Sequence, residues 1–465
     1  MNRPTVNKFL SKLKTIWGNR WVKFGVVSVI YLLWFVVWTG NLWLLLGLVV
    51  IYDIYISKTM YRLFWRKHKE RKRTNKTYRK TSEWVEAILF ATVVATLIRI
   101  FVFEMYVIPT PSMEKSMLVG DYLCVSKTAY GPRIPNTPIS MPLVHNTMPF
   151  SQTKKSFVEW IKWPYHRLKG FGNVKRNDPV VFNFPEGDTV SLAYPSDSYY
   201  NALRQYQRRY GDRRGRQMLM DEGIVVRPVD KRENYVKRAV GLPGDTIFIE
   251  HSEMWINGQP QADIPGKQYN YTVVTNGTPV NPDVFEDMGV AKDDIHYDAA
   301  NYAYVELPLT AENARRMRSM GNVTAIIKRE GEGADPDIFP QSENYPWNVD
   351  NFGPLWIPSK GSTVDLTVEN LPLYRRIIET YEGNKLEIKD GRIYINGTPA
   401  DKYTFAMDYY FMMGDNRHNS LDSRYWGFVP EDHIVGKPSF VWMSLDKDKS
   451  FPANIRWNRI FSKVK

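Results

Sequence analysis

The stretch NYVKRAVGLPGDTIFIE, residues 234–250, decides the fold class of the region around it. β-Branched and aromatic residues fill two short runs, and Gly-Leu-Pro-Gly separates them, a pattern typical of consecutive strands. Similar runs recur after residue 105, separated by Gly, Pro, Asn and Asp: DYLCVSK, DPVVFNF, KLEIKDGRIYING and KPSFVWM. The sequence therefore predicts a mainly β domain over residues 106–465.

Two segments of this domain resemble each other, GDTIFIEHSEMWINGQP at 244–260 and NKLEIKDGRIYINGTP at 384–399. Each reads as strand, turn and strand with an Ile-Asn-Gly corner, so we expect two hairpins of one kind. A solenoid is not expected, because the pattern occurs only twice. Two further stretches look inserted, near 187–230 and 260–380, and RQYQRRYGDRRGRQ in the first favours a short helix.

Two adjacent cations, Lys237 and Arg238, lie in the first run of the opening stretch. Successive side chains of a strand point to opposite faces, so one cation can face the interior while the other faces solvent. A buried ammonium group loses its hydration, and its pKa falls by up to ~3–5 units when burial is complete. Lys237 is then a candidate general base. The alternative is an ordinary edge strand with two exposed charges.

A serine that needs such a base lies in VIPTPSMEKSML, residues 107–118, just after an apolar segment of helix length. The hydroxyl of Ser112 is a weak nucleophile until a base takes its proton. The usual base is histidine, and a Ser-His-Asp arrangement stays open as an alternative to a serine–lysine pair. No sequence pattern links Ser112 to any of the seven histidines, which are His68, His145, His166, His251, His296, His418 and His433.

A third segment, MMGDNRHNSLDSRYWG at 412–427, is crowded with side chains that form hydrogen bonds. Asp422 and Arg424 are two residues apart, so on a strand they would share a face. Ser420 could donate to a neutral amine and orient its lone pair. The simpler interpretation is that Gly-Asp-Asn-Arg forms a turn, but this does not explain the Ser, Asp and Arg that follow.

Three apolar segments precede the β region, at residues 24–39, 42–56 and 84–103. A bilayer core needs ~20 residues per helix, so the first two together are too long for one span. Gly40-Asn41 between them favours a turn, and we expect a helical hairpin, with one long tilted span as the alternative. Ser82 is the expected N-cap of the third segment. A cleaved signal peptide is not expected, because the apolar stretch is too long and no small-residue cleavage site follows it.

The positive charges indicate the orientation of these segments. The densest basic run, RKHKERKRTNKTYRK at 66–80, lies between apolar segments, and the N-terminal tail carries Lys8, Lys12, Lys14 and Arg20. Basic loops stay in the cytoplasm, which explains this part of the net charge of +13 without a nucleic-acid partner. The predicted order, with two or three spans, is a basic cytoplasmic tail 1–20, a transmembrane hairpin 21–57, a basic cytoplasmic loop 58–82, a transmembrane helix 83–105 and an extracytoplasmic β domain 106–465.

The chain's one cysteine, Cys124, excludes an internal disulfide framework. It lies in the alternating run DYLCVSK and is expected to be a core residue of a strand. No Cys/His spacing suggests zinc, and no glycine-rich phosphate loop is present in the sequence. We therefore expect neither a metal nor a cofactor.

Four blocks after the predicted anchor, PSMEKSML, RNDPVVFNFP, KRAVGLPGD and GDNRHNSLDSRYWG, resemble the bacterial type I signal peptidases, also called leader peptidases or serine peptidase family S26. The resemblance covers the anchor and roughly residues 105–135, 175–186, 234–258 and 384–445. It implies a mainly β catalytic domain of the signal-peptidase type with a Ser/Lys dyad, anchored by N-terminal transmembrane α-helices.

By motif position, the resemblance makes Ser112 the nucleophile and Lys237 the general base. It implies an oxyanion hole made of the Ser112 backbone N–H and the hydroxyl of Thr110, where many members have serine. Ser420 would help orient the lysine amine, and Asp422 and Arg424 would form a structural ion pair. The implied pocket residues are Ile108, Pro109, Met113, Met117, Tyr235 and Val236. The chain departs from the family's Pro-Thr-Leu at Lys115-Ser116-Met117, beside the pocket.

The activity that the resemblance implies is removal of N-terminal signal peptides from exported preproteins at Ala-x-Ala sites. The expected location is the plasma (inner) membrane, multi-pass, with the catalytic domain on the extracytoplasmic or periplasmic side. The expected partners are preproteins and the lipid bilayer, with the secretion translocase as a further candidate. The rival interpretation is a membrane-tethered β domain with a binding or scaffolding role. A self-cleaving repressor relative is not favoured, because it would need a DNA-binding module.

Overall fold

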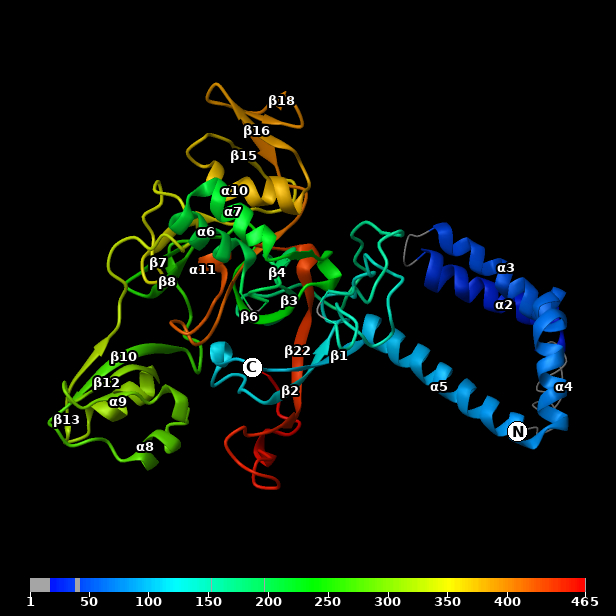
Figure 1. Ribbon diagram of the computed structural model, residues 1–465, viewed down its shortest axis with the longest axis horizontal. Coiled ribbons are helices and arrows are strands. Elements are labelled where there is room, and N and C mark those ends of the chain that lie inside the picture. The colour runs from blue at the N-terminus through cyan, green and yellow to red at the C-terminus, as the bar shows by residue number, and fades with distance from the viewer. Residues whose placement is uncertain (1–16, 38–41, 152, 196, 465) are drawn as a thin grey trace, which may run out of the picture. The chain divides into compact units, whose positions relative to one another are not determined.

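The computed structural model describes residues 17–37, 42–151, 153–195 and 197–464 (Figure 1). The chain forms two compact units, which meet in sequence between Ile98 and Arg99. The first unit is helical and the second is mainly β, so the predicted fold class of the region after residue 105 is confirmed.

Two helical arms of the first unit contact each other. The rings of Phe24 and Tyr52 meet edge to face at 5.8 Å, and the Tyr31 hydroxyl donates to the Leu44 carbonyl at 2.7 Å. The turn expected at Gly40-Asn41 lies outside the described residues, as do the tail residues Lys8, Lys12 and Lys14. The helical elements are α2 (Arg20–Tyr31), η1 (Leu32–Val37), η2 (Leu42–Leu46), α3 (Gly47–Tyr52), η3 (Asp53–Ser57), η4 (Tyr61–Trp65), α4 (Arg66–Thr74) and α5 (Lys76–Phe101).

Within the described part of the chain, two helical stretches are long and apolar enough to cross a membrane, Arg20–Val37 and Lys76–Phe101. A third candidate is the pair Leu44–Ser57 and Tyr61–Thr74, which is bent by 62°. Helix α5 begins eight residues before the predicted start at 84, so the prediction of Ser82 as its N-cap is wrong. Asn75 accepts from the Tyr78 N–H instead, and Ser82 donates to Glu86 inside the helix. Lysine and arginine are good helix formers, which lets the helix extend into the basic run.

The main sheet of the second unit contains seven strands among the described residues, and segments from distant parts of the chain form it. In spatial order they are β1 (Phe103–Val107), β2 (Asp121–Ser126), β22 (Ile434–Ser444), β3 (Pro179–Asn183), β6 (Asn234–Gly241), β20 (Tyr409–Met413) and β21 (Val429–Pro430). Neighbouring strands are antiparallel. Cys124 is buried in β2, and the expectation of a core strand residue is confirmed.

The two expected hairpins are confirmed, and each continues into a short third strand. They are β7 (Thr246–Glu250), β8 (Glu253–Ile256) and β9 (Gln259–Pro260), and β16 (Leu386–Lys389), β17 (Arg392–Ile395) and β18 (Thr398–Pro399). Strand β14 (Phe352–Trp356) extends the first hairpin by pairing with β7, and β15 (Thr363–Asp365) pairs with β19 (Lys402–Thr404).

The stretch 187–230 folds as a small module with two helices, not one, because Gly211 with φ +83° interrupts the helical pattern. Its elements are β4 (Thr189–Ser191), α6 (Tyr199–Tyr210), α7 (Asp212–Asp221) and β5 (Ile224–Val226).

The stretch 260–380 divides into two parts. Its first part is a four-stranded sheet with two helices and an apolar cluster of its own. The remainder joins the largest apolar cluster of the unit through β14 and α10 (Leu371–Arg376). The elements of the first part are β10 (Gln268–Thr275), α8 (Pro282–Asp287), β11 (Tyr297–Asp298), β12 (Ala303–Thr310), α9 (Ala311–Arg318) and β13 (Val323–Lys328).

Candidate active site

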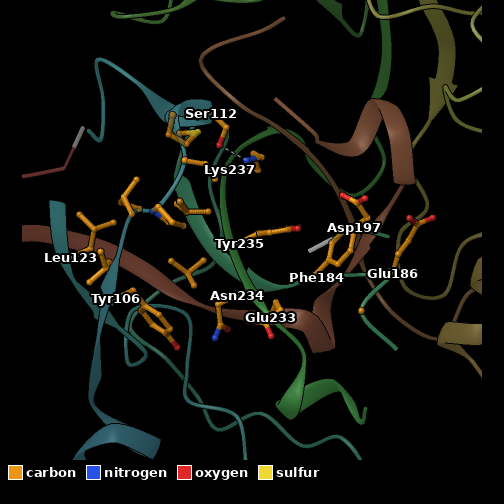
Figure 2. A pocket seen from close by; sticks show the side chains of 18 of the residues that line it. Tyr106, Ser112, Leu123, Phe184, Glu186, Asp197, Glu233, Asn234, Tyr235 and Lys237 are labelled. Carbon is orange, nitrogen blue, oxygen red and sulfur yellow. Dashed lines mark hydrogen bonds between the residues drawn. The ribbon is translucent and has the colours of Figure 1, made fainter. Parts of the chain in front are cut away.

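Ser112 and Lys237, which are 125 residues apart in sequence, meet in a buried hydrogen bond of 2.6 Å between Lys237 Nζ and Ser112 Oγ. Ser112 lies in the short 3₁₀ turn η5 (Pro111–Met113), which belongs to the loop between β1 and β2. Lys237 lies in the middle of the sheet, because β6 pairs with β3 on one side and with β20 on the other. Figure 2 shows the two side chains pointing toward each other.

Burial lowers the pKa of the Lys237 amine from 10.5 to about 8. Lys237 is 5% exposed and its amine lies 5.7 Å from the ring of Tyr235, so the charged form has little hydration. The carboxylates of Asp422 and Asp415 oppose this shift in pKa, and the guanidinium of Arg424 adds to it. The neutral amine, which can accept a proton, is therefore accessible near neutral pH.

The loop 414–417 holds the backbone of the serine turn. The backbone N–H of Asn416 donates to the Ser112 carbonyl at 3.1 Å, and its side-chain amide donates to the Pro111 carbonyl at 3.4 Å. Met113 fixes the turn from below, since it is fully buried in an apolar cluster with Val181 and Leu123. Burial of one such side chain contributes about 1.5–3 kcal/mol.

Gly414 allows this close approach, and Gly414→Ala is expected to reduce kcat/KM about 100-fold. A Cβ at this position would lie 2.6 Å from the Ser112 carbonyl oxygen and 2.2 Å from Ser420 Oγ, so the serine turn must shift. Gly321→Ala is the matched control, because a Cβ there meets nothing within 4 Å. Steady-state kinetics on both variants test this, and wild-type kcat/KM in Gly414→Ala would contradict it.

The Asp422–Arg424 ion pair forms, but not on a strand. Asp422 is the N-cap of the short helix α11 (Ser423–Trp426), and its Oδ1 and Oδ2 accept from Arg424 at 2.9 and 2.8 Å. Asp422 also accepts from the Gly414 N–H at 3.1 Å, which ties the pair to the loop under Ser112. The expected hydrogen bond from Ser420 to Lys237 is not formed, since the buried Ser420 Oγ has no partner within the described part of the chain.

Arg238 does not face solvent, and that expectation is wrong. It is 5% exposed, and Asp415 accepts from its guanidinium at 2.7 and 2.6 Å. The interior position of β6 explains this, since structure covers both of its faces. The same carboxylate accepts from the Ser116 hydroxyl at 2.6 Å, while Lys115 donates to the carbonyls of Met288 and Gly289. The residues that depart from the family pattern are thus tied to neighbouring loops.

A cavity of about 380 Å³ opens beside Ser112 and Lys237. Its lining includes Thr110 and five of the six expected pocket residues, which are Ile108, Pro109, Met113, Tyr235 and Val236. The sixth, Met117, does not line it, because its side chain is fully buried in the apolar cluster beneath. The chain between Ile108 and Gly120 folds back on itself, so Met117 points into the core.

The lining of the cavity also includes three acidic residues that sequence reasoning did not identify, Glu186, Asp197 and Glu233. Tyr235 points toward Phe184 and Asp197, with its ring 4.6 Å from that of Phe184 (Figure 2). Burial, aided by the three carboxylates, raises the pKa of Tyr235 to about 12. These residues come from different segments of the chain, and no local motif marks them.

The two buried histidines near the 412–433 region have partners other than Ser112. His418 Nε2 lies 2.8 Å from Asp350, and its Nδ1 accepts from the Asn270 N–H. His433 lies between Asp432 and Arg232, and burial lowers its pKa to about 4. The geometry therefore favours the serine–lysine arrangement over a Ser-His-Asp one.

Comparisons with known proteins give the same family. A family model described as signal peptidase, peptidase S26, matches residues 81–294 and 402–443. Signal peptidase I of Buchnera aphidicola subsp. Baizongia pistaciae is 23% identical over 91% of this chain and 94% of its own length. Signal peptidase I of Haemophilus influenzae is 24% identical over 83% and 76%, and that of Helicobacter pylori strain 26695 is 23% identical over 82% and 91%.

The two stretches that look inserted differ in this comparison. The match leaves out residues 295–401, most of which fall in the stretch 260–380, whereas the stretch 187–230 lies within the matched range. The match still extends over more than half of the 465 residues, from α5 to β22. The chain therefore belongs to the signal peptidase family, peptidase S26.

Proposed function

We propose that this chain is a membrane-anchored signal peptidase that removes N-terminal signal peptides from exported preproteins, with Ser112 as nucleophile and Lys237 as general base. Its family makes it an enzyme, a serine-type signal peptidase. The observation that carries the mechanism is the 2.6 Å contact between Ser112 Oγ and a buried lysine amine whose pKa is lowered, at the wall of a cavity.

In the proposed reaction, neutral Lys237 accepts the proton of Ser112 as the hydroxyl oxygen attacks the scissile carbonyl. The negative charge that develops on the carbonyl oxygen is stabilised by the Ser112 backbone N–H and the Thr110 hydroxyl, each contributing on the order of 3 kcal/mol. The protonated lysine then gives its proton to the leaving amine. A water molecule, deprotonated by the same lysine, attacks the acyl-enzyme and regenerates the serine.

The supporting residues keep this pair in place. In the proposal, the Asp422–Arg424 ion pair and the loop 414–417 fix the serine turn, and Ser420 lies close to the Ser112 carbonyl around Gly414. Ile108, Pro109, Met113, Tyr235 and Val236 form the walls that hold small side chains such as those of Ala-x-Ala sites. The cavity volume of about 380 Å³ supports a peptide substrate held in extended form.

The proposed location follows from the helices. Ser112 comes eleven residues after the end of α5 at Phe101, so a serine close to the outer surface meets a preprotein where its cleavage site emerges. The basic residues of α4 favour the cytoplasmic side for that helix, and this supports an extracytoplasmic location of the catalytic unit. The proposed partners are the preprotein and the bilayer, with the translocase as a further candidate.

Cleavage of a labelled preprotein by the purified full chain tests the proposal through its pH dependence. Because Lys237 must be neutral to accept a proton, kcat/KM should rise about tenfold per pH unit below pH 8 and level off above it. A free lysine would give a midpoint near 10.4. Ser112→Ala serves as the inactive control. A profile that is flat between pH 6 and 9 would contradict lysine as the base.

A further inference from the structure

The small sheet within residues 268–328 folds around a core of its own. Its four strands form one group with the helices α8 and α9 (Figure 1), and Phe285, Leu307 and Met317 are buried in the apolar cluster of this group. We call this part of the chain the β10–β13 module. The family match ends at residue 294 and resumes at 402, so β11, β12, α9 and β13 lie outside it. The role of the module has to be inferred from what it contacts.

Lys115, which follows Ser112 by three residues, connects the serine turn to this module. Its amine donates to the Met288 carbonyl at 2.9 Å and to the Gly289 carbonyl. These carbonyls lie at the C-terminal end of α8, where backbone acceptors have no partner inside the helix and a lysine can satisfy them. The contact joins positions 173 residues apart in the sequence.

The backbone of Lys115 is shaped for this contact. Its φ is +70°, in the left-handed region that residues other than glycine rarely adopt and that persists only where the surroundings hold it. The family's proline cannot adopt this angle, because its ring fixes φ at about −65°. Two glycines leave the necessary space, since a Cβ at Gly289 would lie 3.0 Å from Lys115 Nζ and one at Gly266 would lie 2.9 Å from Lys115 Cβ. The departure from the family pattern thus makes a contact that proline could not make.

The segment between Ser112 and Lys115 is stiff enough to transmit the position of one residue to the other. Hydrogen bonds close a turn on each side of Lys115, because the N–H groups of Glu114 and Met117 donate to carbonyls three and four residues earlier, at 3.0 and 2.8 Å. The side chain of Met117 is fully buried, which fixes the far end of the segment. A shift of the Lys115 amine therefore moves the turn that carries Ser112.

The β10–β13 module also holds the loop 414–417. At the start of β10, the Gln268 N–H donates to the Asp415 carbonyl, and the Gln268 carbonyl accepts from the Arg417 N–H, both at 2.9 Å. The residue between these two donates to the Ser112 carbonyl, as described above. The module thus contacts both the turn that carries the serine and the loop that holds that turn.

We propose that Lys115 is a positioning residue, through which the β10–β13 module fixes the turn that places Ser112 Oγ 2.6 Å from Lys237 Nζ. This inference rests on the proposed function, because it takes Ser112 as the nucleophile. Lys115 does not line the cavity beside Ser112, so it acts on the geometry of the pair and not on the binding of the peptide. A misplacement of about 1 Å can lower a rate by ~10²-fold.

Lys115→Met in the full chain tests this role, with a labelled preprotein as substrate. The variant keeps the apolar stem of the side chain but donates nothing to α8, and we expect kcat to fall about tenfold while KM changes less than about twofold. Asn313→Ala is the matched control, because the Asn313 side chain donates to the same Met288 carbonyl at 3.1 Å from within the module. It should keep the wild-type kcat. An equal loss in both variants would mean that α8 only needs its hydrogen bonds, and it would overturn the positioning role.

Gly289→Ala disturbs the same contact from the side of the module. Its new Cβ would lie 3.0 Å from the Lys115 amine, so the amine must move, and kcat should fall several-fold with KM unchanged. Gly333→Ala is the control for the backbone, since Gly333 has φ +68° against +63° at Gly289 but nothing within 4 Å of its Cβ position. The double variant Lys115→Met/Gly289→Ala should be no slower than Lys115→Met, because both changes break one contact. Losses that multiply in the double variant would contradict this.

Hydrogen–deuterium exchange of the serine turn separates this inference from the proposed function, because it requires no catalysis. The N–H groups of Glu114 and Met117 are held by the hydrogen bonds described above, and they should exchange several-fold faster in Lys115→Met than in Asn313→Ala or the wild type. Unchanged exchange would overturn the positioning role even if the enzyme is active. Faster exchange in a chain whose wild type cleaves no preprotein would refute the proposed function and retain the hold of Lys115 on the turn.

Discussion

Replacing Lys237 by methionine is expected to lower kcat for preprotein cleavage by about 10⁴-fold or more. Methionine keeps the length and apolar stem of the side chain but has no amine that could take the proton of Ser112, whose Oγ lies 2.6 Å from Lys237 Nζ. Removing one member of such a pair leaves only the contribution of substrate binding and the oxyanion hole. Single-turnover cleavage of a labelled preprotein measures the loss.

Misfolding should not account for this result. The pKa of Lys237 in the folded chain is about 8 against an ordinary 10.5, so between these two values the unfolded state binds more protons and stability rises with pH. At pH 7 the Lys237 amine is mostly protonated, and burial of this charge lowers the free energy of unfolding. Methionine carries no charge and avoids this cost. The melting temperature of Lys237→Met should therefore equal or exceed that of the wild type at pH 7.

Lys267→Met provides the matched control. This lysine is also partly buried beside a tyrosine ring, with Nζ 5.4 Å from Tyr269, and burial lowers its pKa as well. It does not line the cavity of Ser112, so its variant should keep wild-type kcat. The Ser/Lys mechanism would be wrong if Lys237→Met cleaved the preprotein at a rate near that of Lys267→Met.

Removing the carboxylate of Asp422 is expected to have the largest effect on stability. Asp422 is fully buried, and Arg424 is 1% exposed, so Asp422→Ala leaves a buried guanidinium without its carboxylate. Breaking a buried pair in this way costs about 3–5 kcal/mol, which corresponds to a decrease in melting temperature of about 4–6 °C for a unit of this size. The Gly414 N–H also loses its acceptor, so activity should fall with stability.

Thermal unfolding of the full chain in detergent, followed by near-ultraviolet circular dichroism, measures this effect. The control is Asp365→Ala, which breaks an exposed ion pair with Lys402 of 3.6 Å and should leave the melting temperature unchanged, since exposed pairs contribute little. If Asp422→Ala and Asp365→Ala had the same melting temperature, the buried Asp422–Arg424 pair would not stabilise the unit, and the prediction would be wrong.

Local sequence signals predicted much of the fold. The alternation in 244–260 and 384–399 predicted two hairpins, and both form. The apolar run after residue 84 predicted a helix, and α5 covers it. Such signals work because hydrogen bonding within a hairpin or helix and the burial of one face depend on residues close in sequence. The start of α5 was missed, because propensity alone does not choose between a capped helix and one that continues through charged residues.

The candidate pair was also identified from sequence, but its surroundings were not. Motif position and the apolar flanks of β6 led to Ser112 and Lys237. The two side chains form a hydrogen bond of 2.6 Å, and their catalytic role is our proposal. Asp415 and Gly414 were taken as a simple turn, Arg238 as a solvent-facing charge and Met117 as a pocket residue. The positions of Gly414, Asp415 and Arg238 depend on packing between segments more than 100 residues apart in the sequence, and that of Met117 depends on how the loop between β1 and β2 folds back into the core.

The sequence by itself determined the mainly β character of the region after residue 105, the two hairpins, the apolar segments fit to span a membrane, and the two side chains with the right chemistry. Only the tertiary structure decided that the Lys237 amine is buried away from water and within hydrogen-bonding distance of the Ser112 hydroxyl. It did so by placing β6 between β3 and β20 and folding the loop 414–417 against the serine turn. The physical reason is that the pKa of an amine depends on the water and charges around it in space, and those are contributed by residues far apart along the chain.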